Sequence, residues 1–407
     1  MVALLKYKLK RLYHFVKTGL LEGLVSQVRY GFPEKKLVII VVTGTDGKTS
    51  TSTMTYSILK AAGFKVGLIT TVAAYIGEEA IDTGFHVTAP QPTELYAFMR
   101  RMVDAEYTHL VLEMTSHGAY QFRNWGIAPY IAGLTNISHE HFDYHITYDE
   151  YVQAKLSILR SAKHAFINAD DASYRYLKST QRITPRMETY SVHDELSQAV
   201  KKAISSRFKE FYNKMNAHLA VKIAQKLGVG EKALVQGITE YAGVPGRMDL
   251  VATKPIRVLV DFAHTPQALQ SVLTAVREQY PQGKLIVVFG CAGLRDKSKR
   301  PEMGKIGSEL ADTAVFTSED PRTEDVWAII RQMKGGIENT HSRVVTIPDR
   351  FEAITAAINT YARKGDTVLI CGKGHEQSMC YGTTEYPWND AHAVQQVLKK
   401  KKSYYDT

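Results

Sequence analysis

The feature that most constrains the fold is the stretch VVTGTDGKTSTST, residues 41–53. An apolar run, KKLVIIVV, leads into it, and a helix-forming segment, MTYSILKAAG, follows it. A strand that passes through a glycine-rich turn into a helix is typical of a phosphate-binding P-loop, because the free N–H groups and the positive dipole end of the helix face the anion. In that arrangement Lys48 reaches the β- and γ-phosphates, and the Thr49 hydroxyl binds Mg²⁺. The strict P-loop pattern has glycine where this chain has Val42.

Apolar strands alternate with helical segments over residues 37–170 and again over residues 251–400. Such alternation predicts an α/β fold of mostly parallel sheets with helices on their faces. The first stretch is interpreted as a P-loop central domain and the second as a Rossmann-like, doubly wound domain. We therefore expect three parts: a basic N-terminal helical segment (1–37), a central P-loop domain (38–245) and a C-terminal Rossmann-like domain (246–407).

The formal net charge of +10 is concentrated at the two ends of the chain. Residues 1–36 contain eight Lys and Arg against two carboxylates, and residues 399–407 contain four Lys against one. The remainder is nearly neutral, which argues against a nucleic-acid-binding body. The three cysteines form no CxxC pair, so we predict neither a zinc ribbon nor a disulfide framework, and we expect a reducing, cytoplasmic compartment. No apolar run is long enough to span a bilayer.

The N-terminal segment places apolar residues at near-helical spacing, with lysines and an arginine around them. The apolar positions are Leu5, Leu9, Leu12, Val16 and Leu20. Two interpretations follow for this basic amphipathic helix. It either packs on the first domain with a solvated cationic face, which we favour, or lies on an anionic membrane surface as a peripheral contact.

Further polar motifs follow apolar runs, at the predicted carboxyl ends of strands, where doubly wound sheets bind ligands. Glu113 ends one run and is a natural Mg²⁺ ligand beside a P-loop. The segment TNISHEHFDYH (135–145) is interpreted either as one imidazole ligand beside a phosphate-bound ion or as solvated loop histidines. The loop FGCAGLRDKSKRPEMG (289–304) is cationic and suits a phosphate or a carboxylate. TSEDPRTED (317–325) and CGKGHE (371–376) also place charged groups after strands.

Taken in order, these motifs resemble the Mur ligase family, and most of all its UDP-N-acetylmuramoyl-tripeptide synthetases. The series is TGTDGKTSTS, LEMTSHGAYQFR, TNISHEHFDYH, YVQAK, INADD, PGRMD, VDFAHTP, FGCAGLRDKSKRP, EDPRTE and GKGHE. The resemblance extends over residues 38–398. One motif could arise by chance, whereas the full ordered series is highly specific.

The resemblance implies an ATP-dependent ligase that forms an amide bond. ATP would phosphorylate a peptide carboxylate, and the amine of an amino acid would attack the acyl phosphate, which leaves ADP and phosphate. The implied acceptor resembles a UDP-MurNAc-dipeptide, and the implied pathway is peptidoglycan biosynthesis in the cytoplasm. The implied cofactors are ATP and Mg²⁺, the partners are small-molecule substrates without nucleic acid, and a monomer is expected.

The resemblance also assigns roles to residues at matching positions. The catalytic set is Lys48, Glu113, His141 and Lys155, and Lys155 matches a lysine that the family carbamylates. The metal ligands are Thr49, Glu113 and His141. ATP would contact Gly44, Thr45, Asp46, Gly47, Lys48, Thr49, Ser50, Asn213, Asn216, Arg247 and Asp261. The substrates would contact Thr88, Ser116, Gln121 and Arg123 on the acceptor side, His264, and Arg295, Asp320, Arg322, Gly372 and Glu376 on the amino-acid side.

The fifth motif bears on the incoming amino acid. The diaminopimelate-adding enzymes have D-N-P-R where this chain has Glu319-Asp320-Pro321-Arg322. Arg322 can clamp a distal carboxylate bidentately, and Asp320 adds a negative charge near that carboxylate unless it faces the amine. Arg322 together with Glu376 suits a zwitterionic side-chain end, which favours meso-diaminopimelate over lysine.

The chain also departs from the family pattern. About 40 residues precede the P-loop, too few for the N-terminal UDP-binding domain that the family carries. We therefore expect that the enzyme grips UDP in another way or uses another acceptor, such as a lipid-linked or shortened muropeptide.

Three alternatives compete with this interpretation. One is a Mur-like ligase for another acceptor, of the folylpolyglutamate or cyanophycin type. Another is the ligase-like partner of a glutamine amidotransferase, which carries a four-cysteine zinc ribbon that three scattered cysteines cannot build. The last is a non-enzymatic P-loop binding module, which the presence of all four catalytic residues opposes.

Overall fold

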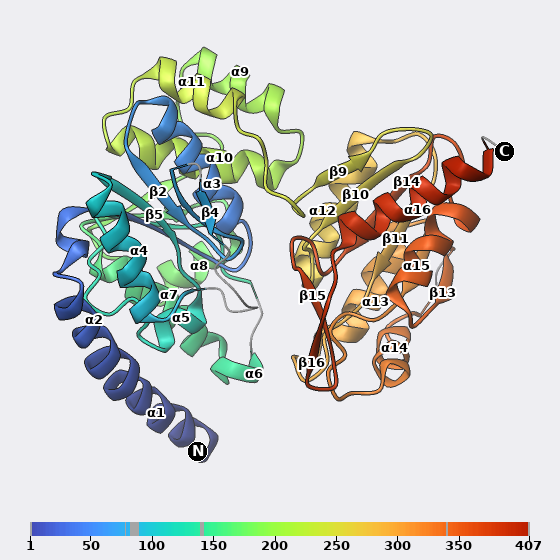
Figure 1. The fold of residues 1–407 in the computed structure, drawn as a ribbon, viewed down its shortest axis with the longest axis horizontal. Helices are drawn as coiled ribbons and strands as arrows, with labels where there is room; N and C mark the ends of the chain where they lie inside the picture. The colour runs from blue at the N-terminus through green and yellow to red at the C-terminus, as the bar shows by residue number, and fades with distance from the viewer. Residues whose placement is uncertain (1, 78, 82–88, 139–141, 339–340, 406–407) are drawn as a thin grey trace. The chain divides into compact units, whose positions relative to one another are not determined.

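The computed structural model describes residues 2–77, 79–81, 89–138, 142–338 and 341–405. Two residues with predicted roles, Thr88 and His141, lie outside the described residues. The chain divides into two compact units, Met1–Ala242 and Gly243–Thr407, each with its own sheet and core (Figure 1). The division falls at the start of the GVPGRMD stretch, three residues before the expected boundary.

The first unit is built on an eight-stranded sheet in the order β4-β3-β2-β5-β1-β6-β7-β8. Its strands are β1 (Val38–Thr43), β2 (Val66–Ile69), β3 (Ala74–Ile76), β4 (Glu79–Ile81), β5 (His109–Glu113), β6 (Ile131–Leu134), β7 (His164–Asn168) and β8 (Met187–Tyr190). All neighbours pair in parallel except β3, which runs antiparallel to β2 and β4. The predicted mostly parallel sheet is confirmed. The strand order reverses beside β1, and open α/β sheets bind ligands beyond the carboxyl ends of strands at such a point.

Helices cover both faces of this sheet. They are η2 (Pro33–Lys36), α3 (Lys48–Ala61), α4 (Pro92–Asp104), α5 (Ser116–Tyr120), α6 (Phe142–His145), α7 (Tyr148–Ser161), α8 (Ala172–Ser179), α9 (Gln198–Arg207), α10 (Phe211–Lys226) and α11 (Glu231–Thr239). On one face, Ile39 and Val41 of β1 share a core with apolar residues of α4 and α7. On the other face, Gly133 of β6 lies against Leu219 and Ile223 of α10, and α10 packs on α3.

The N-terminal segment forms a nearly continuous helix along the outside of the first unit (Figure 1). It comprises α1 (Val2–His14), a π-helical stretch η1 (Phe15–Gly23) and α2 (Leu24–Arg29). Tyr7 is buried, and its hydroxyl forms a 3.0 Å hydrogen bond with Nδ1 of His145. A Cβ added to Gly19 or Gly23 would lie 3.0 or 2.8 Å from atoms of the Trp125 side chain, so the glycines permit close packing. One face of the segment therefore packs on the first unit, but it is not the predicted apolar face, because Leu5, Leu9, Leu12, Val16 and Leu20 are exposed.

The second unit contains a six-stranded sheet in the order β13-β12-β11-β14-β10-β9, in which only β9 is antiparallel to its neighbour. Its strands are β9 (Asp249–Ala252), β10 (Arg257–Asp261), β11 (Leu285–Phe289), β12 (Thr313–Phe316), β13 (Arg343–Thr346) and β14 (Thr367–Cys371), with a separate hairpin of β15 (Ser378–Tyr381) and β16 (Thr384–Pro387). Its helices are α12 (Pro266–Gln279), α13 (Lys299–Leu310), α14 (Val326–Lys334), α15 (Arg350–Ala356), η3 (Ala357–Tyr361) and α16 (Asp390–Tyr405).

Two apolar clusters lie on the two faces of the second sheet. Alternate residues of the central strands pack against α12, α13 and α14 on one face and against α15, η3 and α16 on the other. The doubly wound, Rossmann-like arrangement predicted for this stretch is confirmed. None of the described helices combines the length and the hydropathy needed to cross a membrane.

Candidate active site

The P-loop connects β1 to α3 at the switch point of the first sheet. Gly44 (φ +153°) and Gly47 (φ +78°) adopt backbone conformations that side chains disfavour. A Cβ at Gly44 would lie 1.8 Å from Oγ1 of Thr135, and a Cβ at Gly47 would lie 2.3 Å from Oδ1 of Asn216. Lys48 begins α3, and its Nζ donates a 2.6 Å hydrogen bond to the Thr45 carbonyl oxygen. Both glycines are therefore required by close neighbours as well as by backbone angles.

Hydrogen bonds join the P-loop to residues that follow β6. The Asp46 N–H donates to Oδ1 of Asn136 at 2.9 Å, and Oγ1 of Thr135 donates to the Asp46 carbonyl oxygen at 2.6 Å. Oγ1 of Thr45 accepts a hydrogen bond from the Ser138 N–H at 3.0 Å. These contacts hold the loop in a fixed shape, as an anion-binding turn requires.

Thr49 and Glu113 form a buried pair beside the P-loop. The Thr49 hydroxyl donates to Oε2 of Glu113 at 2.8 Å, and the Thr71 N–H donates to the same oxygen at 3.3 Å. Glu113 is 1% exposed. A hydroxyl and a carboxylate are hard oxygen ligands, so this pair fits one side of a Mg²⁺ site. Among the described residues no three metal-ligating side chains gather, and the third predicted ligand, His141, lies outside them.

Lys155 projects from α7 against the same loop. Its side chain is 1% exposed, its Nζ donates to the Gly44 carbonyl oxygen, and it lies 4.4 Å from the centre of the Tyr151 ring. The Tyr151 hydroxyl lies 2.8 Å from Oγ1 of Thr45. The structure thus brings Lys155 to the P-loop, and its carbamylation stays a prediction.

Two predicted adenine-side residues lie on α10. Asn216 contacts the P-loop at Gly47, and its Nδ2 donates to Oδ1 of Asn213 at 3.4 Å. Asn213 in turn donates to Oε2 of Glu210 at 3.2 Å. Ser50, another residue predicted to contact ATP, lies in the first turn of α3. The two helices that carry predicted ATP contacts, α3 and α10, therefore meet at the P-loop.

The predicted acceptor residues follow β5. Ser116 begins α5 and is buried. Nε of Arg123 donates to Oε1 of Gln121 at 2.9 Å, and Nε2 of Gln121 donates to the Tyr144 hydroxyl at 2.8 Å. Arg123 is 7% exposed and also donates to the Ala89 carbonyl oxygen. Arg123, Gln121 and Tyr144 thus form one partly buried polar network in the first unit.

In the second unit, Arg247 and Asp261 lie together. Asp261 accepts hydrogen bonds from the N–H groups of Met248 (2.7 Å) and Ala263 (2.8 Å), and the Arg247 guanidinium lies 4.2 Å from the centre of the Phe262 ring. Burial raises the pKa of Asp261, and the positive charge of Arg247 opposes that rise. Nε of Arg247 is buried without a hydrogen-bond partner among the described residues, which is consistent with a ligand-facing group.

The cationic loop after β11 contains both buried side chains that are paired within the protein and side chains that are exposed. Arg300 is fully buried and binds Glu324 with both terminal nitrogens, at 2.9 and 3.1 Å. Lys299 donates to the His264 carbonyl oxygen at 2.6 Å, whereas Arg295 is exposed. The interpretation that this whole loop serves a ligand is wrong for Arg300, because a buried guanidinium requires its own carboxylate.

Asp320 is held inside the fold. Its Oδ1 accepts hydrogen bonds from Nζ of Lys373 at 2.7 Å and from the Cys380 N–H at 2.9 Å. Lys373 is fully buried and also lies 2.5 Å from Oε2 of Glu376. The expected negative charge facing a substrate carboxylate is therefore balanced within the protein by Lys373. Arg322 is partly exposed at φ +53°, a conformation that costs free energy for a non-glycine residue.

Lys373 and Glu319 are two further polar residues of the second unit to which the sequence motifs assigned no role. Oε2 of Glu319 is buried and has no hydrogen-bond partner among the described residues. A Cβ at Gly372 would lie 2.3 Å from that oxygen, so the glycine leaves room for the carboxyl group. Burial raises the pKa of Glu319, and Lys299 most strongly opposes the rise. The only available signal was their position, next to selected residues in EDPR and GKGHE.

Comparison with protein families gives two matches that follow the two units. The Mur ligase middle domain matches residues 42–227, and the Mur ligase glutamate ligase domain matches residues 246–374. The N-terminal helices lie before both matched regions.

Relatives and solved structures agree with the family matches. UDP-N-acetylmuramoyl-L-alanyl-D-glutamate--2,6-diaminopimelate ligase of Clostridium botulinum is 34% identical over 399 residues, which covers 93% of this chain and 81% of the relative. A solved structure of a ligase with the same name is 29% identical, with a TM-score of 0.58, and the match covers 93% of this chain and 82% of that one. E. coli FolC in complex with ADP has a TM-score of 0.68 and 20% identity, over 96% and 95% of the two chains, and shows likeness of fold.

The P-loop, the residues fastened around it and both domain matches thus point the same way: this chain belongs to the Mur ligase family, whose members are ATP-dependent ligases that form amide bonds.

Proposed function

We propose that the chain is an ATP-dependent ligase that adds meso-diaminopimelate to a UDP-MurNAc-L-alanyl-D-glutamate-like acceptor in peptidoglycan biosynthesis. One observation carries the proposal: the fastened P-loop has the buried Thr49–Glu113 pair and Lys155 beside it. Similarity to proteins that bear this activity in their names, over most of their length, supports the choice of acceptor and amino acid.

The chemistry explains the arrangement. A carboxylate and a γ-phosphate repel one another, so the enzyme must hold both in line for phosphoryl transfer. The N–H groups at the start of α3 and Nζ of Lys48 would hold the triphosphate. Thr49 and Glu113 would hold Mg²⁺, which neutralises phosphate charge when it is bound. His141 completes this ligand set by resemblance alone.

The amine would approach the carboxyl ends of the strands in the second unit. Arg322 offers a guanidinium to the distal carboxylate of diaminopimelate. Arg322→Ala is therefore expected to raise KM for diaminopimelate at least tenfold while KM for ATP changes little, because a charge-assisted contact is worth about 1.5–3 kcal/mol. Equal changes in both KM values would contradict this assignment.

Phosphate release tests the activity. Purified protein receives ATP, Mg²⁺ and UDP-MurNAc-L-Ala-D-Glu, with meso-diaminopimelate, with L-lysine or with no amine, and Lys48→Ala serves as the inactive control. We expect release that depends on both substrates and is fastest with diaminopimelate. Release only with a folate acceptor and glutamate would favour the folylpolyglutamate alternative, because the chain shares its fold with a folylpolyglutamate synthase.

We further propose that the enzyme is a cytoplasmic monomer that contacts the membrane through its N-terminal helix. The outer face of this helix is unusually apolar: of 18 exposed large apolar side chains in the described residues, 11 lie in residues 4–28. A continuous stripe runs along it, comprising Leu5, Leu9, Leu12, Val16, Leu20, Leu24 and Val28.

The helix geometry keeps this stripe on one side. In a pure α-helix, steps of four residues drift around the axis because a turn takes 3.6 residues. The hydrogen bonds of the π-helical stretch Phe15–Gly23 span five residues, so its wider turns offset the drift between Val16 and Val28. Six Lys and Arg stand against one carboxylate, Glu22, in residues 2–29, which fits an anionic lipid surface.

Vesicle sedimentation tests the membrane contact. The wild type is expected to bind vesicles that contain phosphatidylglycerol and to bind pure phosphatidylcholine vesicles weakly. Leu5→Ser combined with Leu9→Ser and Leu12→Ser should weaken binding more than tenfold, since burying each leucine is worth about 1.5–3 kcal/mol. The control combines Leu250→Ser and Leu294→Ser, exposed leucines of the second unit. If the wild type dimerises without vesicles and the triple variant does not, the stripe binds a second copy and the membrane proposal is wrong.

A further inference from the structure

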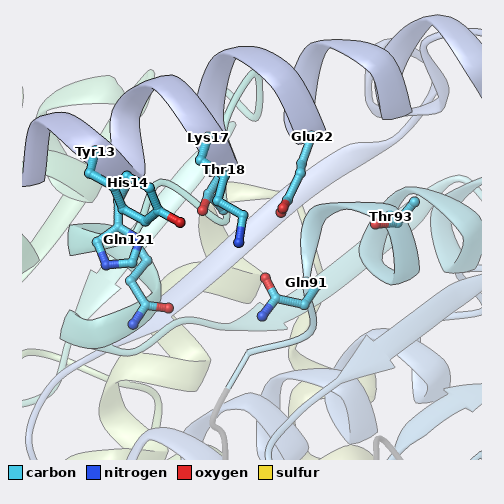
Figure 2. A pocket seen from close by; sticks show the side chains of 8 residues that line it. All are labelled: Tyr13, His14, Lys17, Thr18, Glu22, Gln91, Thr93 and Gln121. Atoms are coloured by element: carbon cyan, nitrogen blue, oxygen red, sulfur yellow. The ribbon is translucent and has the colours of Figure 1, made fainter. Parts of the chain in front are cut away.

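A cavity of about 350 Å³ lies between the N-terminal helix and the body of the first unit. Five lining residues come from the helix, and three come from the body. Figure 2 shows the side chains of Lys17 and Glu22 extending from the helix toward Gln91, and His14 beside Gln121. The cavity is lined largely by polar groups, so it suits a polar ligand.

Positive charge gathers around this cavity. Lys17 lines it, and burial together with the charges of Lys10, Arg123 and Lys17 lowers the pKa of His14. Glu22 is the one carboxylate in its lining. The cations act on the same imidazole, so their fields overlap where the cavity lies, and an anion would be favoured there.

Unused hydrogen-bonding capacity points in the same direction. Nε2 of His14 is buried and has no hydrogen-bond partner among the described residues. An unpaired buried nitrogen is unfavourable, and a neutral imidazole can donate from it to a phosphate oxygen. The Gln91 amide and the Thr93 hydroxyl, at the start of α4, offer further donors.

The cavity adjoins the residues proposed for the acceptor. Gln121 lines it and accepts the hydrogen bond from Arg123, so one side chain belongs to both places. A group attached to the acceptor sugar could therefore extend into the cavity while the peptide lies toward Ser116. The helix that forms one wall precedes the region matched by the family domain.

We propose that this pocket binds the phosphate that the acceptor carries on its sugar, with Lys17 and His14 as the main contacts. The inference rests on the proposed function and deepens it. A nucleotide-linked and a lipid-linked muropeptide share this diphosphate, so the pocket recognises the chemistry common to both. Lys17 and His14 are positioning residues here, since they bind the phosphate end of the acceptor, which is distant from its reacting carboxylate.

The test compares three acceptors that share the L-Ala-D-Glu dipeptide: UDP-linked, lipid-diphosphate-linked and phosphate-free. Lys17→Gln and His14→Gln are compared with Lys8→Gln, which removes an exposed charge from the same helix. We expect Lys17→Gln to raise KM about tenfold for a diphosphate-bearing acceptor, with kcat, KM for ATP and KM for the phosphate-free acceptor unchanged. The diphosphate acceptor that shows this dependence identifies the natural source.

An equal rise for the phosphate-free acceptor, or an equal effect of Lys8→Gln, would overturn the inference. Isothermal calorimetry measures the binding of the UDP-linked acceptor to the wild type and to Lys17→Gln. It distinguishes a failure of the pocket proposal from a failure of the proposed ligase function, because binding does not require turnover. Loss of binding in Lys17→Gln supports the pocket even if no acceptor is turned over. Binding that is unaltered in both Lys17→Gln and His14→Gln rejects it.

Discussion

At the scale of single residues, the candidate site is built from buried polar side chains that contact the P-loop. Lys155 is the clearest case, because its side chain is buried and its Nζ donates a hydrogen bond to the Gly44 carbonyl oxygen in the P-loop. The resemblance predicts that this lysine is converted to a carbamate.

Lys155→Ala is expected to lower kcat at least 100-fold, because the resemblance gives this lysine a catalytic role beside the phosphates. If the active form is a carbamate, formate or acetate should restore part of the rate in the Ala variant. Steady-state kinetics with and without these anions measures both effects. Lys155→Met keeps the packing volume and should show no rescue, whereas unchanged kcat in the Ala variant would remove Lys155 from the mechanism.

Glu319 gives a prediction about stability and pH. Burial raises its pKa in the folded protein above the value of about 4.3 for an unfolded chain. The folded state therefore loses stability, relative to the unfolded state, as the pH rises from below 4.3 through the folded pKa. Glu319→Gln removes this loss, so it should raise the melting temperature at pH 7.5 more than at pH 4.

Glu324 provides a control of opposite sign. Arg300 lowers the pKa of Glu324 to about 2, so its stabilisation is present above the unfolded pKa and is lost as the pH falls toward 2. Glu324→Gln should therefore lower the melting temperature at pH 7.5 and have less effect near pH 3. Thermal melts that show the same sign for both variants would contradict the burial argument for Glu319 or the ion-pair argument for Glu324.

At the scale of elements, the strand–loop–helix unit of β1 and α3 works only if glycine occupies its tight positions. Gly47 combines φ +78° with a close approach to Asn216, whereas Gly63 has φ +82° and no neighbour within 4 Å of an added Cβ. The two glycines share a backbone conformation and differ in their surroundings.

Gly47→Ala should therefore raise KM for ATP at least tenfold, since Asn216 or the loop must shift. Gly63→Ala should cost only about 1 kcal/mol of stability from its backbone conformation and leave KM for ATP unchanged. ATP titrations and denaturant unfolding of the two variants measure the difference. Equal KM values would show that the loop absorbs the added methyl group.

At the scale of the whole molecule, the two units have separate sheets and separate cores. The second unit has helices on both faces of its sheet and buries its central strands within itself. A domain of this size buries enough apolar surface to fold alone.

The fragment 243–407 is accordingly expected to unfold in one cooperative transition when it is produced by itself. Circular dichroism during heating, with near-ultraviolet signals for fixed side-chain packing, measures this. A gradual loss of signal without a transition would show that the core of the second unit needs the first.

Much of the fold followed from local patterns. Alternating apolar runs and turn residues predicted both sheets, because strand periodicity and P-loop turns are encoded by neighbouring residues. The ordered motifs predicted that Lys48, Thr49 and Glu113 lie at one edge of the sheet, and the structure brings them together there, since parallel strands bring their carboxyl ends together. Their role in phosphate binding stays a prediction.

The sequence by itself thus determined the α/β class, the two sheets and the family. Only the tertiary structure decided which charged groups serve the fold and which remain for a ligand. Arg300 pairs with Glu324, and Asp320 pairs with Lys373, over separations in the chain that no local pattern encodes. The N-terminal helix shows the same limit: its periodicity predicted an apolar face, but packing chose a different face to bury and left the leucine stripe exposed. The ion-pair and packing partners of a residue depend on contacts between distant parts of the chain, whereas periodicity depends on neighbouring residues. For this reason the sequence revealed the elements, and only the tertiary structure revealed the partners.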